Sequence, residues 1–173
     1  NQPELTPDSR SVLFLRSGPR DTVLHFYRFD LADQSTHELA GGNDAPENLS
    51  VEEKARRERA RLSLSGITHF DVTPDGRSAI AARGGQLLNV DLASGTATPI
   101  AGSWIAPRLS PDGKRLLAVK DDDLYVIRIA DGDTTRLPKG GPSDLPHGLA
   151  EFAAAEELAR AAGSWWSPAG QTV

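Results

Sequence analysis

The chain has 173 residues, of which 38% are hydrophobic and none is cysteine, and this is enough for one domain with a core. Its 19 basic and 24 acidic residues argue against a nucleic-acid-binding surface. No apolar run approaches the ~20 residues of a membrane span. Because the chain has no cysteine, disulfides and thiolate metal sites are excluded. Because it begins at Asn1 and stops at Val173 just after a turn signal, we expect the chain to be part of a longer protein.

One tetrapeptide recurs along the chain. Its full forms begin at Thr73 and Ser110 and read Thr/Ser-Pro-Asp-Gly, and altered copies begin at Thr6 and Ser167. Proline presets φ, aspartate bonds back to the local backbone, and glycine takes a positive φ, so the motif predicts a tight turn.

Three short strands are predicted after each of the first three turns. In chain order they are 11–16, 22–31 and 35–39, then 77–82, 86–92 and 96–100, then 114–120, 124–129 and 134–137.

Short strands repeated around a turn motif are typical of propeller blades. A sandwich of consecutive hairpins is the alternative, but it does not explain the recurring turn. The sequence therefore predicts an all-β fold, a partial β-propeller of about three blades and the start of a fourth. Since an incomplete ring exposes strand edges, we expect the chain alone to be marginally stable or self-associating.

Two helical insertions interrupt the repeats. The first, about 49–64, has a capping box at Ser50 and Glu53 and is rich in arginine toward its end. The second, about 149–162, is rich in alanine and has Gly163 as its expected C-cap.

The charges of these insertions have two interpretations. The plain one is solvated helix faces, with Glu156 and Arg160 forming an i,i+4 pair. The other is a two-carboxylate seat, Glu156 and Glu157, for an ammonium group, which has three donors and no acceptor. An arginine of the first insertion could then supply the counter-charge.

Residues 147–160 (HGLAEFAAAEELAR), followed by Gly163-Ser164-Trp165-Trp166-Ser167-Pro168, resemble the double-glutamate segment of the dipeptidyl peptidase IV family. Glu52-Glu53 and residues 57–62, followed by Gly66-Ile67, resemble the arginine helix of its bacterial members and of the cytosolic dipeptidyl peptidases. Ala159 and Ser164 depart from the family pattern, which has an acidic and an aromatic residue there.

The resemblance implies that residues 1–173 are an incomplete N-terminal β-propeller domain of a serine exopeptidase that releases N-terminal dipeptides, with Pro or Ala in the second position. It implies that Glu156 and Glu157 bind the substrate α-amino group. Arg61 would contact the peptide backbone, with Arg57 as the alternative after a one-turn slip. The α/β-hydrolase domain that carries Ser, Asp and His would follow and is absent here.

The chain itself is expected to hold no catalytic residue, cofactor or metal. It has no Gly-x-Ser-x-Gly elbow, no Walker loop and no metal-ligand cluster, its four histidines stand singly, and residues 121–123 are expected to be a solvated hairpin tip. Trp165 and Trp166 are expected in the blade core.

The expected partners are peptide substrates with a free N-terminus, the missing hydrolase domain and a second copy in a homodimer, with no nucleic acid and no membrane span. The resemblance places the protein in the periplasm or medium of a bacterium, with the cytoplasm as the alternative. The competing function is a non-catalytic propeller acting as a binding or scaffold module, which would not need Glu156, Glu157 and Arg61.

Overall fold

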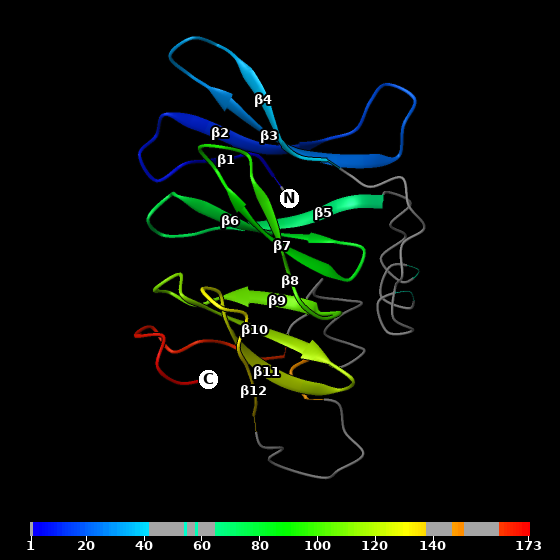
Figure 1. Cartoon of the computed structure of the whole chain (residues 1–173), viewed down its shortest axis with the longest axis vertical. Coiled ribbons are helices and arrows are strands. Elements are labelled where there is room, and N and C mark those ends of the chain that lie inside the picture. The colour runs from blue at the N-terminus through cyan, green and yellow to red at the C-terminus, as the bar shows by residue number, and fades with distance from the viewer. Residues whose placement is uncertain (1, 42–53, 55–57, 59–64, 138–146, 151–162) are drawn as a thin grey trace. The chain divides into compact units, whose positions relative to one another are not determined.

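The chain forms two compact units, Asn1–Gly102 and Ser103–Val173. The structure, a computed structural model, describes residues 2–41, 54, 58, 65–137, 147–150 and 163–173. The elements whose bounds lie within these ranges are strands, joined mostly by short turns into antiparallel layers (Figure 1).

The first unit holds two four-stranded antiparallel blades. The first blade consists of β1 (Glu4–Leu5), β2 (Ser11–Arg16), β3 (Val23–Asp30) and β4 (Thr36–Ala40), and the second of β5 (Ser65–Val72), β6 (Ser78–Arg83), β7 (Gln86–Asp91) and β8 (Ala97–Ile100). Consecutive strands pair within each blade. The two blades are joined where β3 runs parallel to β5, with Val23 opposite Ser65 and Leu24 opposite Gly66.

The second unit holds a third blade and the turn that begins the next repeat. Its strands are β9 (Ile105–Leu109), β10 (Arg115–Lys120), β11 (Asp123–Arg128) and β12 (Thr134–Arg136), which pair in consecutive order. Three four-stranded blades, whose sheets do not close on themselves, confirm the predicted all-β partial propeller.

The nine predicted strands are confirmed to within a residue at each end, but β1, β5 and β9 were missed. Each of these lies immediately before a turn motif. β5 contains Gly66, and β9 contains Pro107, and both residue types weaken a strand pattern. Pro107 is tolerated because β9 is the edge strand of its sheet.

The Thr73 turn shows how the tetrapeptide works. The amide of Thr73 donates to the carbonyl of Ser78 over 2.9 Å, and the amide of Gly76 donates to the carbonyl of Thr73 over 2.8 Å. The Thr73 hydroxyl donates to Asp75 Oδ1 over 2.7 Å. Gly76 has a φ of 67°, the left-handed region that favours glycine.

The other three copies keep this geometry. The Thr6 and Ser110 turns repeat both backbone bonds and the hydroxyl-to-aspartate bond. In the Thr6 turn Ser9 takes the glycine place at a φ of 57°. The Ser167 turn keeps both backbone bonds although Ala169 stands in the aspartate place. The backbone pattern therefore survives the loss of either motif residue.

Within each unit, successive turns also pack on one another. A Cβ added to Gly76 would lie 3.1 Å from Cδ of Pro7, and one added to Gly170 would lie 3.2 Å from Cδ of Pro111. The motif proline thus lies against the motif glycine of the following turn.

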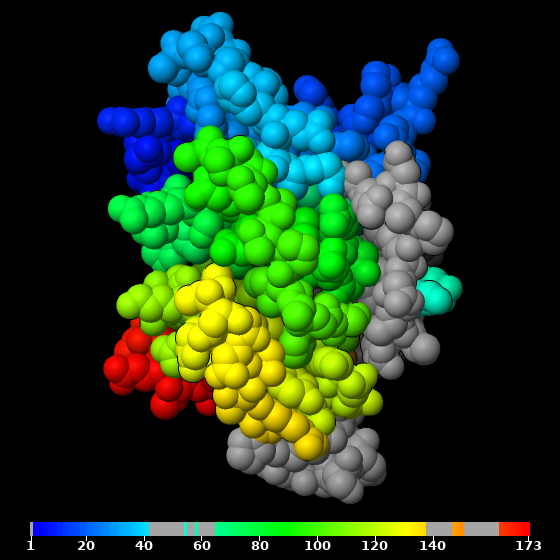
Figure 2. Space-filling view, viewed as in Figure 1, coloured from blue at the N-terminus to red at the C-terminus, as the bar shows by residue number. Residues whose placement is uncertain are grey.

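Each unit has its own apolar core. In the first unit β2 to β7 contribute, and the fully buried rings of Phe26 and Phe70 lie 4.6 Å apart between centroids. Figure 2 shows the cyan residues that include β4 against the green residues of the second blade, and β4 contacts β7. The core of the second unit consists of Ile105, Leu117, Val119 and Leu124, with Val126, Leu137, Leu149 and Trp166 packed against it.

The two predicted inserted helices, about 49–64 and 149–162, fall almost entirely outside the described residues. Only Lys54 and Glu58 of the first and Leu149 and Ala150 of the second are described. The structure therefore does not confirm these helices.

Candidate functional site

The predicted substrate-binding residues Glu156, Glu157 and Arg61, and the alternative Arg57, all lie outside the described residues. The structure does describe the places where the two insertions leave and re-enter the blades. These insertion bases are the parts of the candidate site whose geometry is known.

The second insertion base consists of Gly148, Leu149, Gly163 and Ser164. The amide of Gly163 donates to the carbonyl of Gly148 over 2.8 Å, so the two ends of the insertion meet. The amide of His147 donates to the carbonyl of Asp122 over 2.8 Å, which ties the base to the hairpin between β10 and β11.

Both glycines of this base occupy places that a side chain would fill. Gly148 has a φ of 84°, and an added Cβ would lie 2.7 Å from Cδ1 of Leu124 and 2.8 Å from Cγ2 of Val119. A Cβ added to Gly163 would overlap the backbone carbonyl of Leu149. The base therefore closes only because neither residue has a side chain.

The second insertion base stands on the core of its unit. Leu149 and Trp166 both pack against that core. The indole N–H of Trp166 donates to the carbonyl of Arg108 over 3.1 Å, and the Arg115 guanidinium lies 5.3 Å from the Trp166 ring centroid. Arg115 also donates to the carbonyl of Gly170. These contacts hold the chain in place after it leaves the insertion.

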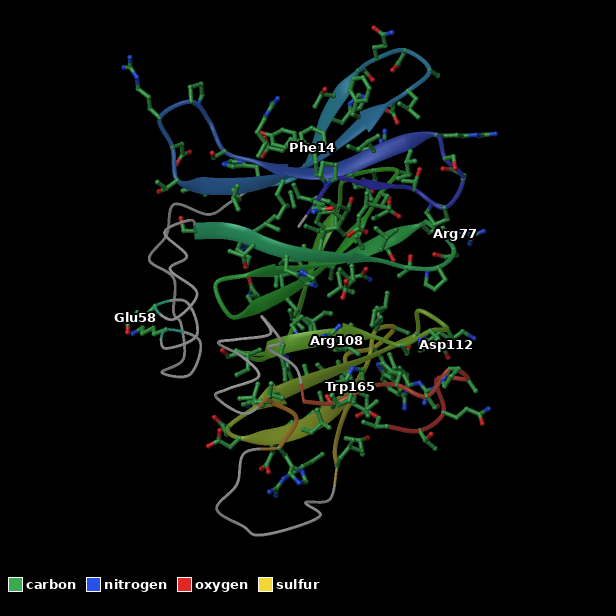
Figure 3. The ribbon with its side chains drawn as sticks, turned by 180° about the vertical axis from the view of Figure 1, so that it is seen from behind. Phe14, Glu58, Arg77, Arg108, Asp112 and Trp165 are labelled. Carbon is green, nitrogen blue, oxygen red and sulfur yellow. The ribbon has the colours of Figure 1, made fainter. Side chains whose placement is uncertain are left out.

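The prediction that both tryptophans are core is wrong for Trp165. Its side chain, labelled in Figure 3, is 56% exposed. Trp166 instead packs against the core of the same unit. Neighbouring residues of an extended chain point to opposite sides, so only one of an adjacent pair can enter this core.

The first insertion base consists of Gly41, Ser65 and Gly66. Arg83 Nη1 donates to the carbonyl of Gly41 over 3.2 Å, where the chain leaves β4. The amide of Ser65 donates to the carbonyl of Thr22 over 2.9 Å, where the chain returns.

Gly66 lets the returning chain lie close against β3. Its φ is 77°, and an added Cβ would lie 2.5 Å from the carbonyl oxygen of Leu24 and 2.8 Å from Cγ1 of Val23. Both insertion bases thus rely on glycines set against a neighbouring strand.

The hairpin to which the second base is tied carries three aspartates, Asp121, Asp122 and Asp123. Asp123, only 12% exposed, pairs with Arg136 over 2.7 Å. Asp121 and Asp122 form the hairpin tip at φ values of 50° and 59°, which confirms the predicted turn, but Asp123 belongs to β11.

The pKa values of the motif aspartates Asp75 and Asp112 are shifted. These aspartates lie in the turns before β6 and β10, at the opposite end of each strand from the hairpin that follows it. The hydroxyl of Thr73 lowers the pKa of Asp75 by hydrogen bonding, and the hydroxyl of Ser110 does the same for Asp112. Figure 3 labels Asp112 at its turn.

Within the described ranges, no three His, Asp or Glu side chains gather into a group that could hold a metal ion. The search of the same ranges also finds no helix long and apolar enough to cross a membrane.

The close approach of the two glycines in the second base was not predicted from the sequence. Gly163 was predicted as the C-cap of the second insertion, whose residues 151–162 lie outside the described residues, and the structure shows that its amide donates to the carbonyl of Gly148. The available signal was the pair of glycines that brackets the alanine-rich segment.

Comparison with known families gives one match, over residues 72–173, to the family described as the dipeptidyl peptidase IV (DPP IV) N-terminal region. The matched range covers more than half of the chain and contains the whole second insertion base.

Three solved structures are similar in fold. Dipeptidyl peptidase 4 of Porphyromonas gingivalis is 18% identical over 95% of the chain, with a TM-score of 0.56. TolB from Acinetobacter baumannii is 22% identical over 83%, and oligogalacturonate lyase from Vibrio parahaemolyticus is 16% identical over 76%, each with a TM-score of 0.49. The chain covers 23%, 33% and 37% of these structures, so it spans about a quarter to a third of their length.

Proposed function

Because the chain belongs to the family of the dipeptidyl peptidase IV N-terminal region, we propose that it is the front part of the propeller domain of a serine exopeptidase that releases N-terminal dipeptides. The task of this segment is to bind the substrate α-amino group through Glu156 and Glu157. The observation that carries the proposal is the extent of the family match, because residues 72–173 include the double-glutamate segment together with its base.

The chemistry of the glutamate pair suits this task. A substrate ammonium offers three donors, and two carboxylates held close together accept them as charge-assisted hydrogen bonds. Two adjacent carboxylates repel each other unless a cation lies near, and the ammonium or Arg61 supplies that charge. A site that holds the amino end and leaves no room beyond it limits the product to a dipeptide.

The place of each insertion within its own blade supports a binding role. Both follow the last strand of a blade, the first after β4 and the second after β12. In repeat proteins, insertions into single repeats often carry the residues that bind a ligand.

In this proposal a following α/β-hydrolase domain with Ser, Asp and His carries out the chemical step. The substrates have Pro or Ala as their second residue. Binding energy at the amino end holds the scissile bond for the nucleophile, so a remote site raises the rate of that step.

The test is a pair of charge-removing variants, Glu156→Gln and Glu157→Gln, in the full-length protein. We expect each to lower kcat/KM for a chromogenic Ala-Pro substrate with a free amine by on the order of 100-fold, because charged hydrogen bonds are lost. Glu151→Gln, in the same segment, is the matched control and should change kcat/KM little. Unchanged kinetics in both variants would refute the amine site and favour a binding or scaffold module.

The arginine assignment is tested separately. Arg61→Ala should lower kcat/KM by a smaller factor than the glutamate variants, about tenfold, and Arg57→Ala should leave it unchanged. A larger loss at Arg57 would show that the register is displaced by one turn.

A further inference from the structure

Gly148 and Gly163 close the second insertion base, and they lie in the described part of the chain. We propose that these two glycines are positioning residues, which set where the double-glutamate segment leaves the blade and therefore where Glu156 and Glu157 meet the substrate amine. This inference rests on the proposed function of the pair.

Gly163 fixes the distance between the two ends of the insertion. Its amide donates to the carbonyl of Gly148 over 2.8 Å, and an added Cβ would overlap the carbonyl of Leu149. That carbonyl is a backbone group and cannot rotate aside as a side chain could. A methyl group at residue 163 must therefore push the two ends apart.

Gly148 fixes the base against the core. Its φ of 84° is open to glycine, and an added Cβ would meet Leu124 and Val119. Both side chains are buried, at 7% and 1% exposure. Close-packed core groups resist displacement, so a methyl group at residue 148 must lift the base from the blade.

A displaced base has a chemical consequence. Charge-assisted hydrogen bonds need heavy-atom distances of about 2.7–2.9 Å, and an ammonium shared by two carboxylates must meet this for both. A misplacement of about 1 Å can cost on the order of 100-fold in rate. The glycines act through the glutamates and do not touch the substrate in this proposal.

Gly132 provides a matched comparison in the same unit. It lies in the turn before β12 with a φ of 74°, and an added Cβ would meet nothing within 4 Å. An alanine there carries the cost of a positive φ without any steric conflict. It therefore separates general backbone strain from displacement of the base.

The experiment uses the full-length protein with Gly163→Ala, Gly148→Ala and Gly132→Ala. Each variant is assayed on a free-amine Ala-Pro chromogenic substrate and on p-nitrophenyl acetate, an ester without an amine. For the free-amine substrate we expect kcat/KM to fall about 100-fold, about tenfold and less than about threefold, respectively. Ester hydrolysis should change less than about threefold in all three.

Partial rescue gives a second readout. Val119→Ala removes one of the two methyl contacts, so adding it to Gly148→Ala should restore part of the lost kcat/KM, a non-additive result. This double variant also keeps the test informative if Gly163→Ala does not fold.

The outcomes separate the two proposals. Equal losses on the free-amine substrate and the ester would mean a general folding defect and overturn the positioning role. A strong effect of Glu157→Gln with none for either base glycine overturns the positioning role alone. If acetylation of the substrate amino group leaves the kcat/KM of the wild-type protein unchanged, both the amine site and the positioning role are overturned.

Discussion

The two ends of the strands in each blade are built in different ways. At the end that carries the Thr/Ser-Pro-Asp-Gly turns, here called the turn end, the backbone bonds of each motif close within six residues, as from Thr73 to Ser78. At the insertion end, the contacts join residues far apart in the chain, such as Gly66 with Leu24 and Gly148 with Leu124.

The difference lies in tolerance to change. The turn keeps its backbone bonds with Ser9 in the glycine place or Ala169 in the aspartate place. The insertion bases leave no room for one methyl group at Gly66, Gly148 or Gly163. Local hydrogen bonds thus form the recurring turns, whereas close packing between residues far apart in the chain fixes where the insertions leave and re-enter the blades.

The largest effect is expected at the first insertion base. Gly66→Ala should lower the free energy of unfolding by about 3 kcal/mol, because it combines a positive φ with a Cβ against the Leu24 backbone. Chemical denaturation of the chain measures this, with Gly132→Ala expected to cost about 1 kcal/mol. Equal costs for the two variants would remove the proposed contrast between base and turn glycines.

A turn aspartate should matter less. Asp112→Ala loses the bonds from the Ser110 hydroxyl at 2.6 Å and the Lys114 amide at 3.1 Å. Because the carboxylate is 38% exposed, we expect a loss of only about 1 kcal/mol in unfolding free energy. The matched control Lys114→Ala keeps that amide and should fall within about 0.5 kcal/mol of wild type. A cost as large as that of Gly66→Ala would show that the turn end is not the tolerant one.

The fourth turn, Ser167 to Gly170, lacks the motif aspartate, which a substitution can restore. Ala169→Asp should raise the unfolding free energy by about 0.5–1 kcal/mol, because Ser167 would then have the acceptor that Thr73 and Ser110 already have. The same change in a Ser167→Ala background has no hydroxyl donor and should gain less. Equal gains in both backgrounds would mean that the hydroxyl bond contributes nothing.

Acid should weaken the turn end selectively. The pKa values of Asp8, Asp75 and Asp112 are lowered in the folded chain, first by a hydroxyl hydrogen bond. The folded state therefore binds protons more weakly than the unfolded one, so this stability is present above the ordinary pKa of 3.8 and is lost as pH falls through the folded value.

The variant Asp75→Asn should lose less stability than wild type between about pH 5 and pH 2. Urea midpoints measured across that range show the difference, which we expect to be the smallest of the four effects. Parallel curves for the two proteins would exclude Asp75 as a source of the acid sensitivity.

The sequence predicted the parts of the fold that depend on neighbours in the chain. Turn chemistry located all four turns, and alternation located the strands that follow them, such as β10 and β11. The strands β5 and β9 escaped because Gly66 and Pro107 break the pattern, and only pairing with a partner strand stabilises them.

For the candidate site, the sequence by itself determined the residue types, a glutamate pair and an arginine in two insertions, and the family resemblance that the match over residues 72–173 confirms. Only the tertiary structure decided that Gly148 and Gly163 meet, that Gly66 lies against Leu24, and that Trp165 is exposed while Trp166 is packed. The physical reason is range: a turn is specified by the preferences of a few adjacent residues, whereas a close approach depends on side chains brought in from distant parts of the chain.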